Sequence, residues 1–82
     1  MADEHTTDQR VLGTIKHLVD EEHALRNQND LDDHARARLQ SIRVELDQCW
    51  DLLRQRRALR ESGEDPDKAH VRAPDIVENY EQ

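Results

Sequence analysis

The sequence predicts an all-α fold, an antiparallel two-helix hairpin with a short C-terminal docking tail that forms a four-helix bundle as a dimer. Three observations support this prediction. Apolar residues recur at steps of three and four in two stretches, as on one face of a helix. Turn-forming Asn and Asp residues separate the two stretches at 27–30. No strand-like alternation is sustained. We therefore expect residues 1–82 to form a single small helical domain.

The first helix is expected over about residues 7–27. Thr6 and Gln9 have the spacing of a capping box at its start. Its apolar stripe consists of Val11, Ile15, Leu18 and Leu25. Glu22 interrupts this stripe, with Arg26, Arg36 and Arg43 within possible reach. We predict that Glu22 is a polar residue that sets the helix register, because a catalytic carboxylate would need a pocket and a second titrating group.

The second helix is expected over about residues 33–62, after a turn at 28–32. Asp32 is its predicted N-cap and Gly63 its C-terminal stop. Its stripe consists of Leu39, Ile42, Leu46, Cys49 and Leu53, and the next position in the series is Arg56. Because this helix is longer than the first, its basic end from about Gln55 onward is expected to extend beyond the hairpin partner.

The remaining segment, 63–82, is predicted to cover that exposed end. Pro66 suits the first position of a short helical turn. The segment's apolar residues are interleaved with acids and comprise Val71, Ile76, Val77 and Tyr80. This chemistry favours docking on an apolar and basic surface, either in the same chain or in a partner. The alternative is a disordered acidic tail.

The charge distribution favours internal neutralisation. The net charge is −7, yet residues 32–62 hold seven bases against six acids, so both flanking regions are acidic. The arginines Arg54, Arg56, Arg57 and Arg60 could contact nucleic-acid phosphate, which makes a nucleic-acid-associated accessory factor the alternative function. That segment contains no stacking aromatic residue, and the overall charge opposes phosphate binding. We therefore do not expect nucleic acid as a partner.

Self-association is the leading structural prediction. A hairpin has two apolar stripes and no third layer of structure. Residues that flank the stripes, such as Leu12 and Val19, would therefore remain exposed to solvent in a monomer. A homodimer would bury these flanks, whereas a monomer would need its tail as the third layer. We expect an interaction module without catalytic activity, with a homodimer or an unidentified protein as partner. The candidate interaction surface comprises Trp50, Leu52, Arg54, Arg56, Arg57, Leu59 and Arg60.

The sequence offers little for catalysis. Asp20 and His23 have the i, i+3 spacing of some bundle metal sites, but the register directs them away from the seam. Cys49 is the only cysteine, which excludes an intrachain disulfide and suggests a small buried residue in a reducing compartment. We predict no enzyme, no cofactor and no metal; a ligand or metal sensor is the weaker alternative. The absence of a long apolar run indicates no membrane span and a cytoplasmic location.

Two motifs carry a family resemblance. The segments DEEHALR at 20–26 and ELDQCWDLLRQRRALR at 45–60 resemble those of a small family of uncharacterised actinobacterial proteins. The Val71-Arg72-x-Pro74 and Val77-Glu78-x-Tyr80 segments are also similar to that family's tail. The resemblance covers nearly the whole chain and implies a helical hairpin. The family is a domain of unknown function, so it supplies no catalytic residue.

Overall fold

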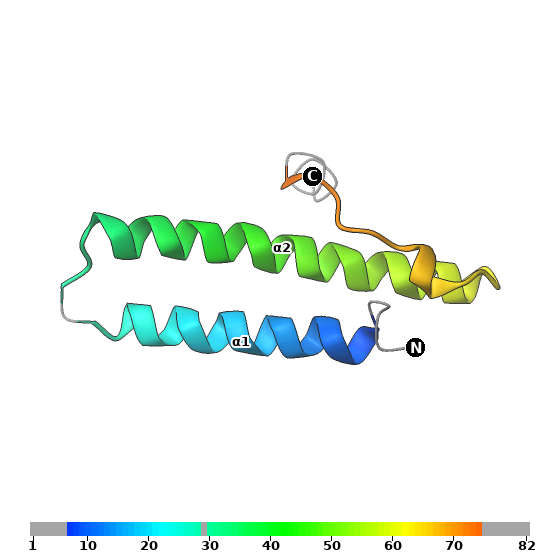
Figure 1. The fold of residues 1–82 in the computed structure, drawn as a ribbon, viewed down its shortest axis with the longest axis horizontal. Helices are drawn as coiled ribbons and strands as arrows, with labels where there is room; N and C mark the ends of the chain where they lie inside the picture. Colours follow the sequence, from blue (N-terminus) through cyan, green and yellow to red (C-terminus); the bar gives the residue numbers. More distant parts are fainter. Residues whose placement is uncertain (1–6, 29, 75–82) are drawn as a thin grey trace.

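The chain folds into a long helical hairpin in a computed structural model that describes residues 7–28 and 30–74. Helix α1 spans Asp8–Arg26 and helix α2 spans Asp33–Glu61, and the two lie side by side in opposite directions (Figure 1). A short 3-10 helix, η2, spans Pro66–Lys68. The described residues contain no strand. The all-α hairpin predicted from the sequence is thus confirmed.

The start of α1 differs from the prediction by one residue. Thr7, and not Thr6, is the N-cap, and its hydroxyl accepts the backbone N–H of Arg10 at 3.2 Å. Arg10 stands at the third helical position, where a capping box would require Glu or Gln. The helix therefore begins with a simple threonine cap, while Thr6 lies outside the described residues.

Helix α2 has the ends that the sequence indicates. The carboxylate of Asp32 accepts the N–H of Ala35 at 2.8 Å. At the other end Gly63 adopts φ +80°, a left-handed conformation that glycine takes without a Cβ clash. This allows the N–H of Glu64 to reach the carbonyl of Leu59 at 2.7 Å. The arrangement is a Schellman motif, and it turns the chain back along α2.

The core lies in the seam between the helices. Val11, Ile15 and Leu52 form its buried centre, and the residues that pack against them are Val19, Leu46, Cys49, Leu53 and Ala69. Trp50 lies outside this core and is 45% exposed. Leu52, which the sequence assigned to the candidate interaction surface, is instead a core residue.

The described part of the tail, up to residue 74, docks on its own hairpin. It runs back along the side of α2 that faces away from α1 (Figure 1). Pro66 opens η2, as expected, and Ala69 adds a small apolar contact to the core. Val71 was predicted to be an apolar anchor, but it is 59% exposed. The other predicted anchors, Ile76, Val77 and Tyr80, lie outside the described residues.

Candidate functional site

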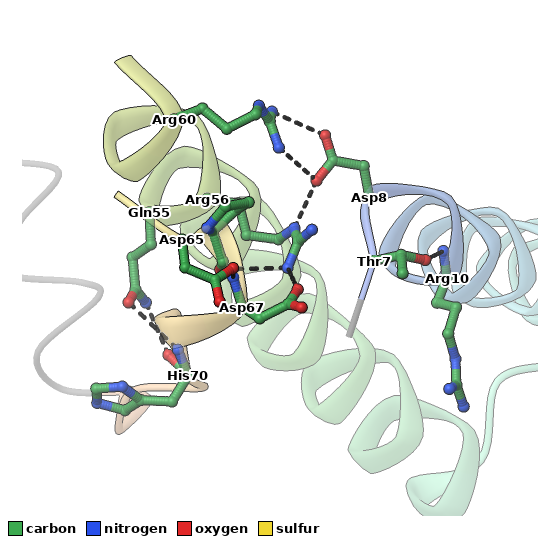
Figure 2. A network of polar contacts seen from close by, with 10 residues as sticks. Thr7, Asp8, Arg10, Gln55, Arg56, Arg60, Asp65, Asp67 and His70 are labelled. Carbon is green, nitrogen blue, oxygen red and sulfur yellow. Dashed lines mark hydrogen bonds and ion pairs between the residues drawn. The ribbon is translucent and has the colours of Figure 1, made fainter. Parts of the chain in front are cut away.

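The basic end of α2 is the centre of a network that joins three parts of the chain. Arg56 is only 5% exposed, and its guanidinium lies between α1 and η2 (Figure 2). Its Nε donates to Asp8 Oδ1 at 2.5 Å, and its Nη1 donates to Asp67 Oδ1 at 3.0 Å. Nη1 also donates to the carbonyl of Pro66 at 3.2 Å. We call this set of side chains, completed by Arg60, the Arg56 network.

Asp8 is shared by two arginines of this network. Arg60 donates from Nη2 to Asp8 Oδ2 at 2.8 Å and from Nη1 to Oδ1 at 3.2 Å. The hydrogen bonds from Arg60 and Arg56 hold the pKa of Asp8 below its ordinary value of 3.8. The antiparallel hairpin therefore brings an acid from the start of the chain to the basic end of α2, as the charge distribution predicted.

A second set of polar contacts holds the tail on the outer side of α2. Asp51 is fully buried, and Arg72 donates to both of its carboxylate oxygens. Gln55 donates to Asp51 at 2.9 Å and to the carbonyl of His70 at 2.7 Å. Gln48 donates to the carbonyl of Arg72 at 3.1 Å. We call the four side chains Gln48, Asp51, Gln55 and Arg72 the tail clasp.

The clasp is electrostatic in character. The hydrogen bond from Arg72 is the main reason that the pKa of Asp51 lies below its ordinary value of 3.8, against the opposing effect of burial. A buried carboxylate is stable only when its oxygens accept hydrogen bonds. Here the guanidinium of Arg72 and the side-chain amide of Gln55 donate them. Removal of Arg72 would take away the charged donor that binds both oxygens of Asp51, so the tail and α2 stabilise each other.

A third polar cluster connects the helices near the turn. Arg38 of α2 donates from Nε and Nη2 to the two oxygens of Glu21 at 2.6 and 2.7 Å. Its Nη1 also donates to Glu45 at 3.0 Å. The bonds from Arg38 lower the pKa of Glu21. The sequence predicted that Glu22 sets the register between the helices. Glu22 instead pairs with Arg26 of its own helix at 3.4 Å. We infer that Glu21 sets the register between the helices.

The Glu21–Arg38 contact also identifies the two sides of the hairpin. In a helix, residues seven apart lie on the same stripe. Arg38, Glu45 and Leu52 form one such stripe of α2, and it lies on the side that faces Glu21. The stripe of Arg43, Trp50 and Arg57 lies on the other side.

Helix α1 has the same two sides. Glu21 shares its stripe with Thr14, whereas Leu12 and Val19 form the stripe that lies on the side of Trp50. Leu12 is 48% exposed and lies near the level of Trp50, since the preceding Val11 packs against Leu52. The set comprising Leu12, Arg43, Asp47, Trp50, Arg54 and Arg57 is named the Trp50 surface.

The predicted interaction surface thus divides into two groups. Leu52 and Arg56 are buried within the chain, and Leu59 is half-buried. Arg60 belongs to the Arg56 network. Trp50, Arg54 and Arg57 are exposed, and Arg57 pairs with Glu61 at 3.3 Å. By helix periodicity, this last group lies on the same side of the hairpin as Leu12.

The candidate metal and membrane features were compared with the part of the chain that the structure describes. No three His, Cys, Asp or Glu side chains converge within 7–28 and 30–74 as metal ligands would. Asp20 pairs with Lys16 at 2.9 Å on the exposed face of α1. Cys49 lies in the seam, where burial raises the pKa of its thiol and disfavours the reactive thiolate. No helix among these residues is long and apolar enough to cross a membrane.

The spacing of several important residues in the sequence did not reveal their roles. Asp51 stands outside the apolar stripe of α2, like any surface acid, and nothing in its spacing points to Arg72, which lies 21 positions away. Glu21 and Arg38 are likewise ordinary charged helix residues. Their roles depend on where the hairpin and the tail place them. One available signal was that Asp51 and Arg72 both fall within the motifs of the family resemblance.

Comparison with known proteins agrees with that resemblance. Residues 7–82 match the family model described as protein of unknown function (DUF2630). Uncharacterised proteins of Mycobacterium tuberculosis and Mycobacterium bovis are each 51% identical to the chain over 78 residues, covering 90% of this chain and 90% of the relative. No solved structure matches the chain. The chain therefore belongs to the DUF2630 family, a small family with uncharacterised mycobacterial members.

Proposed function

We propose that this protein is a non-catalytic interaction module that forms a homodimer through the Trp50 surface. One observation carries the proposal. The tail covers one flank of α2, and on the other flank Leu12 and Trp50 remain 48% and 45% exposed on the same side of the hairpin. Exposed large apolar side chains that adjoin one another are typical of protein contact surfaces, and tryptophan is enriched at their energetic centres.

The size of the core supports the need for a partner. The buried apolar residues among 7–28 and 30–74 are Val11, Ile15, Leu18, Ala35, Ile42 and Leu52. A core of this size is marginal for an independent domain. Full burial of a Leu-sized side chain contributes about 1.5–3 kcal/mol. Two copies that cover Leu12 and Trp50 would therefore gain an amount that is large relative to the stability of one hairpin.

The chemistry of the chain suits binding and not catalysis. The buried carboxylate of Asp51 accepts hydrogen bonds that hold the fold together. Asp8 accepts hydrogen bonds from two arginines. The thiol of Cys49 is kept in its unreactive form by burial. A single cysteine in this state suits a reducing compartment, and we place the module in the cytoplasm.

The nucleic-acid alternative has less support. Arg56 and Arg60 are bound to Asp8, and Arg57 is bound to Glu61. Phosphate binding would have to displace these carboxylates. We therefore retain self-association as the proposed function.

Sedimentation equilibrium of the full chain tests the proposal. We expect a dimer at tens of micromolar, and we expect Trp50→Gln and Leu12→Gln to weaken it at least about tenfold while helicity is kept. Val71→Gln is the matched control, since Val71 is 59% exposed but lies on the tail. A fully helical wild-type monomer at this concentration would refute the proposal.

A further inference from the structure

The three α2 side chains of the tail clasp all contact one short stretch of the tail. Gln48, Asp51 and Gln55 follow one another at steps of three and four, so they form a single stripe of α2. Each of them makes a hydrogen bond to His70 or Arg72. The stripe therefore has the form of a binding site for a short peptide segment, which the chain's own tail occupies.

Two of these side chains bind the main chain of the tail. The amide of Gln55 donates to the carbonyl of His70 at 2.7 Å, and its oxygen accepts the N–H of the same residue at 3.4 Å (Figure 2). Gln48 donates to the carbonyl of Arg72 at 3.1 Å. Main-chain groups are common to all peptides, so these contacts fix the position and direction of a segment without selecting its sequence.

Selectivity comes from two tail residues that contact the hairpin. Arg72 donates to both oxygens of the fully buried Asp51, a pairing that the planar guanidinium makes and a lysine cannot reproduce. Ala69 has extended backbone angles and packs against the hydrophobic cluster. His70 and Val71, which lie between them, are exposed. The site thus fits a small residue that is followed three positions later by arginine.

We propose that this stripe of α2 binds a non-helical segment of a partner protein that carries a small residue and, three positions later, an arginine. The tail of the chain then acts as a competitor that occupies the site in cis. All three polar side chains stand on one helix, so a second segment can enter the site without rearrangement of the hairpin. This inference does not depend on self-association through Trp50.

The tail is attached in a way that permits exchange. Residues 70–72 are held by polar contacts, and the side chain of Arg72 is 32% exposed, so a competing arginine can approach the pair. A tethered segment acts at an effective concentration on the order of millimolar, so the wild-type chain should bind a free peptide only weakly. Weakening the hold of Arg72 should therefore open the site.

A binding experiment on the full chain tests this site. The probe is a fluorescein-labelled peptide of residues 68–74, and its binding is followed by fluorescence anisotropy. We expect Arg72→Gln to bind the peptide at least about tenfold more tightly than the wild type does, since the tail then lacks its charged anchor. Arg72→Lys keeps a positive charge beside Asp51 but lacks the planar fork, so its affinity for the peptide should also rise. Circular dichroism verifies that both variants are helical.

Further substitutions identify the groups that recognise the peptide. In the Arg72→Gln chain, Asp51→Asn is expected to weaken peptide binding at least about tenfold and Gln55→Ala about threefold or more. Asp20→Asn and Gln40→Ala are the matched controls, because both residues are exposed and lie outside the tail clasp. A peptide with citrulline in place of its arginine keeps the shape without the charge, and we expect it to bind at least about tenfold more weakly.

Three outcomes would separate the possibilities. Equal peptide affinity of the wild type and both Arg72 variants would overturn the proposal, as would equal binding of the citrulline peptide. A wild-type dimer that Arg72→Gln dissociates and Trp50→Gln leaves intact would assign the site to the tail of a second copy and overturn a separate partner. A monomeric chain that binds the peptide once Arg72 is replaced would support this site and refute self-association alone.

Discussion

At the scale of single residues, Arg56 shows how burial changes what a charge contributes. It continues the spacing of the apolar stripe of α2, yet it is an arginine and is nearly fully buried. Its cost of desolvation is offset by two carboxylates and a carbonyl from different parts of the chain. Arg57, the next residue, lies in solvent with one local partner.

Arg56 and Arg57 therefore form a matched pair for mutation. Arg56→Met is expected to lower the free energy of unfolding by about 2 kcal/mol, since it removes the group that joins α1, α2 and η2. Arg57→Met is expected to change it by less than about 0.5 kcal/mol, because exposed pairs contribute little. Urea unfolding followed by circular dichroism measures both. Equal effects would show that the Arg56 network adds no stability beyond that of a surface pair.

The two glycines form another pair with opposite expectations. Gly63 has φ +80°, so Gly63→Ala is expected to cost about 1 kcal/mol. Gly13 lies inside α1, and a Cβ there would meet nothing within 4 Å, so Gly13→Ala is expected to add about 1 kcal/mol. Thermal unfolding of each variant checks the signs. A destabilising Gly13→Ala would indicate that another chain approaches α1 closely at this point.

At the scale of elements, polar groups hold the described part of the tail, residues 64–74. Within these residues Ala69 contacts the hydrophobic cluster, and the exposed Val71 adds little. The tail clasp supplies the remaining attachment through Asp51 and Arg72. Docking of this kind depends on charge, so it is sensitive to conditions that leave the apolar seam between the helices unchanged.

Acid titration is the corresponding prediction. The pKa values of Asp8, Glu21 and Asp51 are lower in the folded chain than in the unfolded chain. Between the two values the unfolded chain binds more protons, so stability rises with pH there. We expect a constant free energy of unfolding from pH 7 to about pH 5 and a decline below about pH 4, as the lowered folded values are crossed.

Asp51→Asn isolates the contribution of the clasp to that decline. The variant should be less stable than the wild type at pH 7 by about 1–3 kcal/mol. The difference should shrink below about pH 4, because Asp51 of the unfolded wild type binds a proton there while the folded carboxylate is still ionised. Urea unfolding at pH 7, 5 and 3.5 measures it. A difference that is independent of pH would mean that shape, and not charge, holds the tail.

At the scale of the whole molecule, one flank of the hairpin is closed by the tail and the other presents the Trp50 surface. If a second copy covers that surface, the melting temperature depends on protein concentration by mass action. We expect the melting temperature of the wild type to rise by several degrees between about 5 and 500 μM, whereas that of Trp50→Gln should stay constant. Differential scanning fluorimetry or calorimetry measures both. A concentration-independent wild type would show that dimerisation and folding are not linked.

The sequence by itself determined the elements of this protein. Local signals defined both helices, since the periodic apolar residues, the Asp32 cap and the Gly63 stop depend on contacts within a few positions. The charge distribution also predicted that acids would meet the basic end of α2, and Asp8 does so. Only the N-cap of α1 was displaced, by one residue, because Thr6 and Thr7 are chemically equivalent at this position.

Tertiary structure alone decided which charges are buried and which apolar groups are exposed. Leu52 and Trp50 are two residues apart on α2, and the position of α1 and the tail places the first in the core and the second in solvent. Asp51 becomes a buried anchor because the tail brings Arg72 to it from 21 residues away. The periodicity of the sequence cannot show which of these residues is buried and which is exposed, because the two flanks of a helix are equivalent until another segment covers one of them.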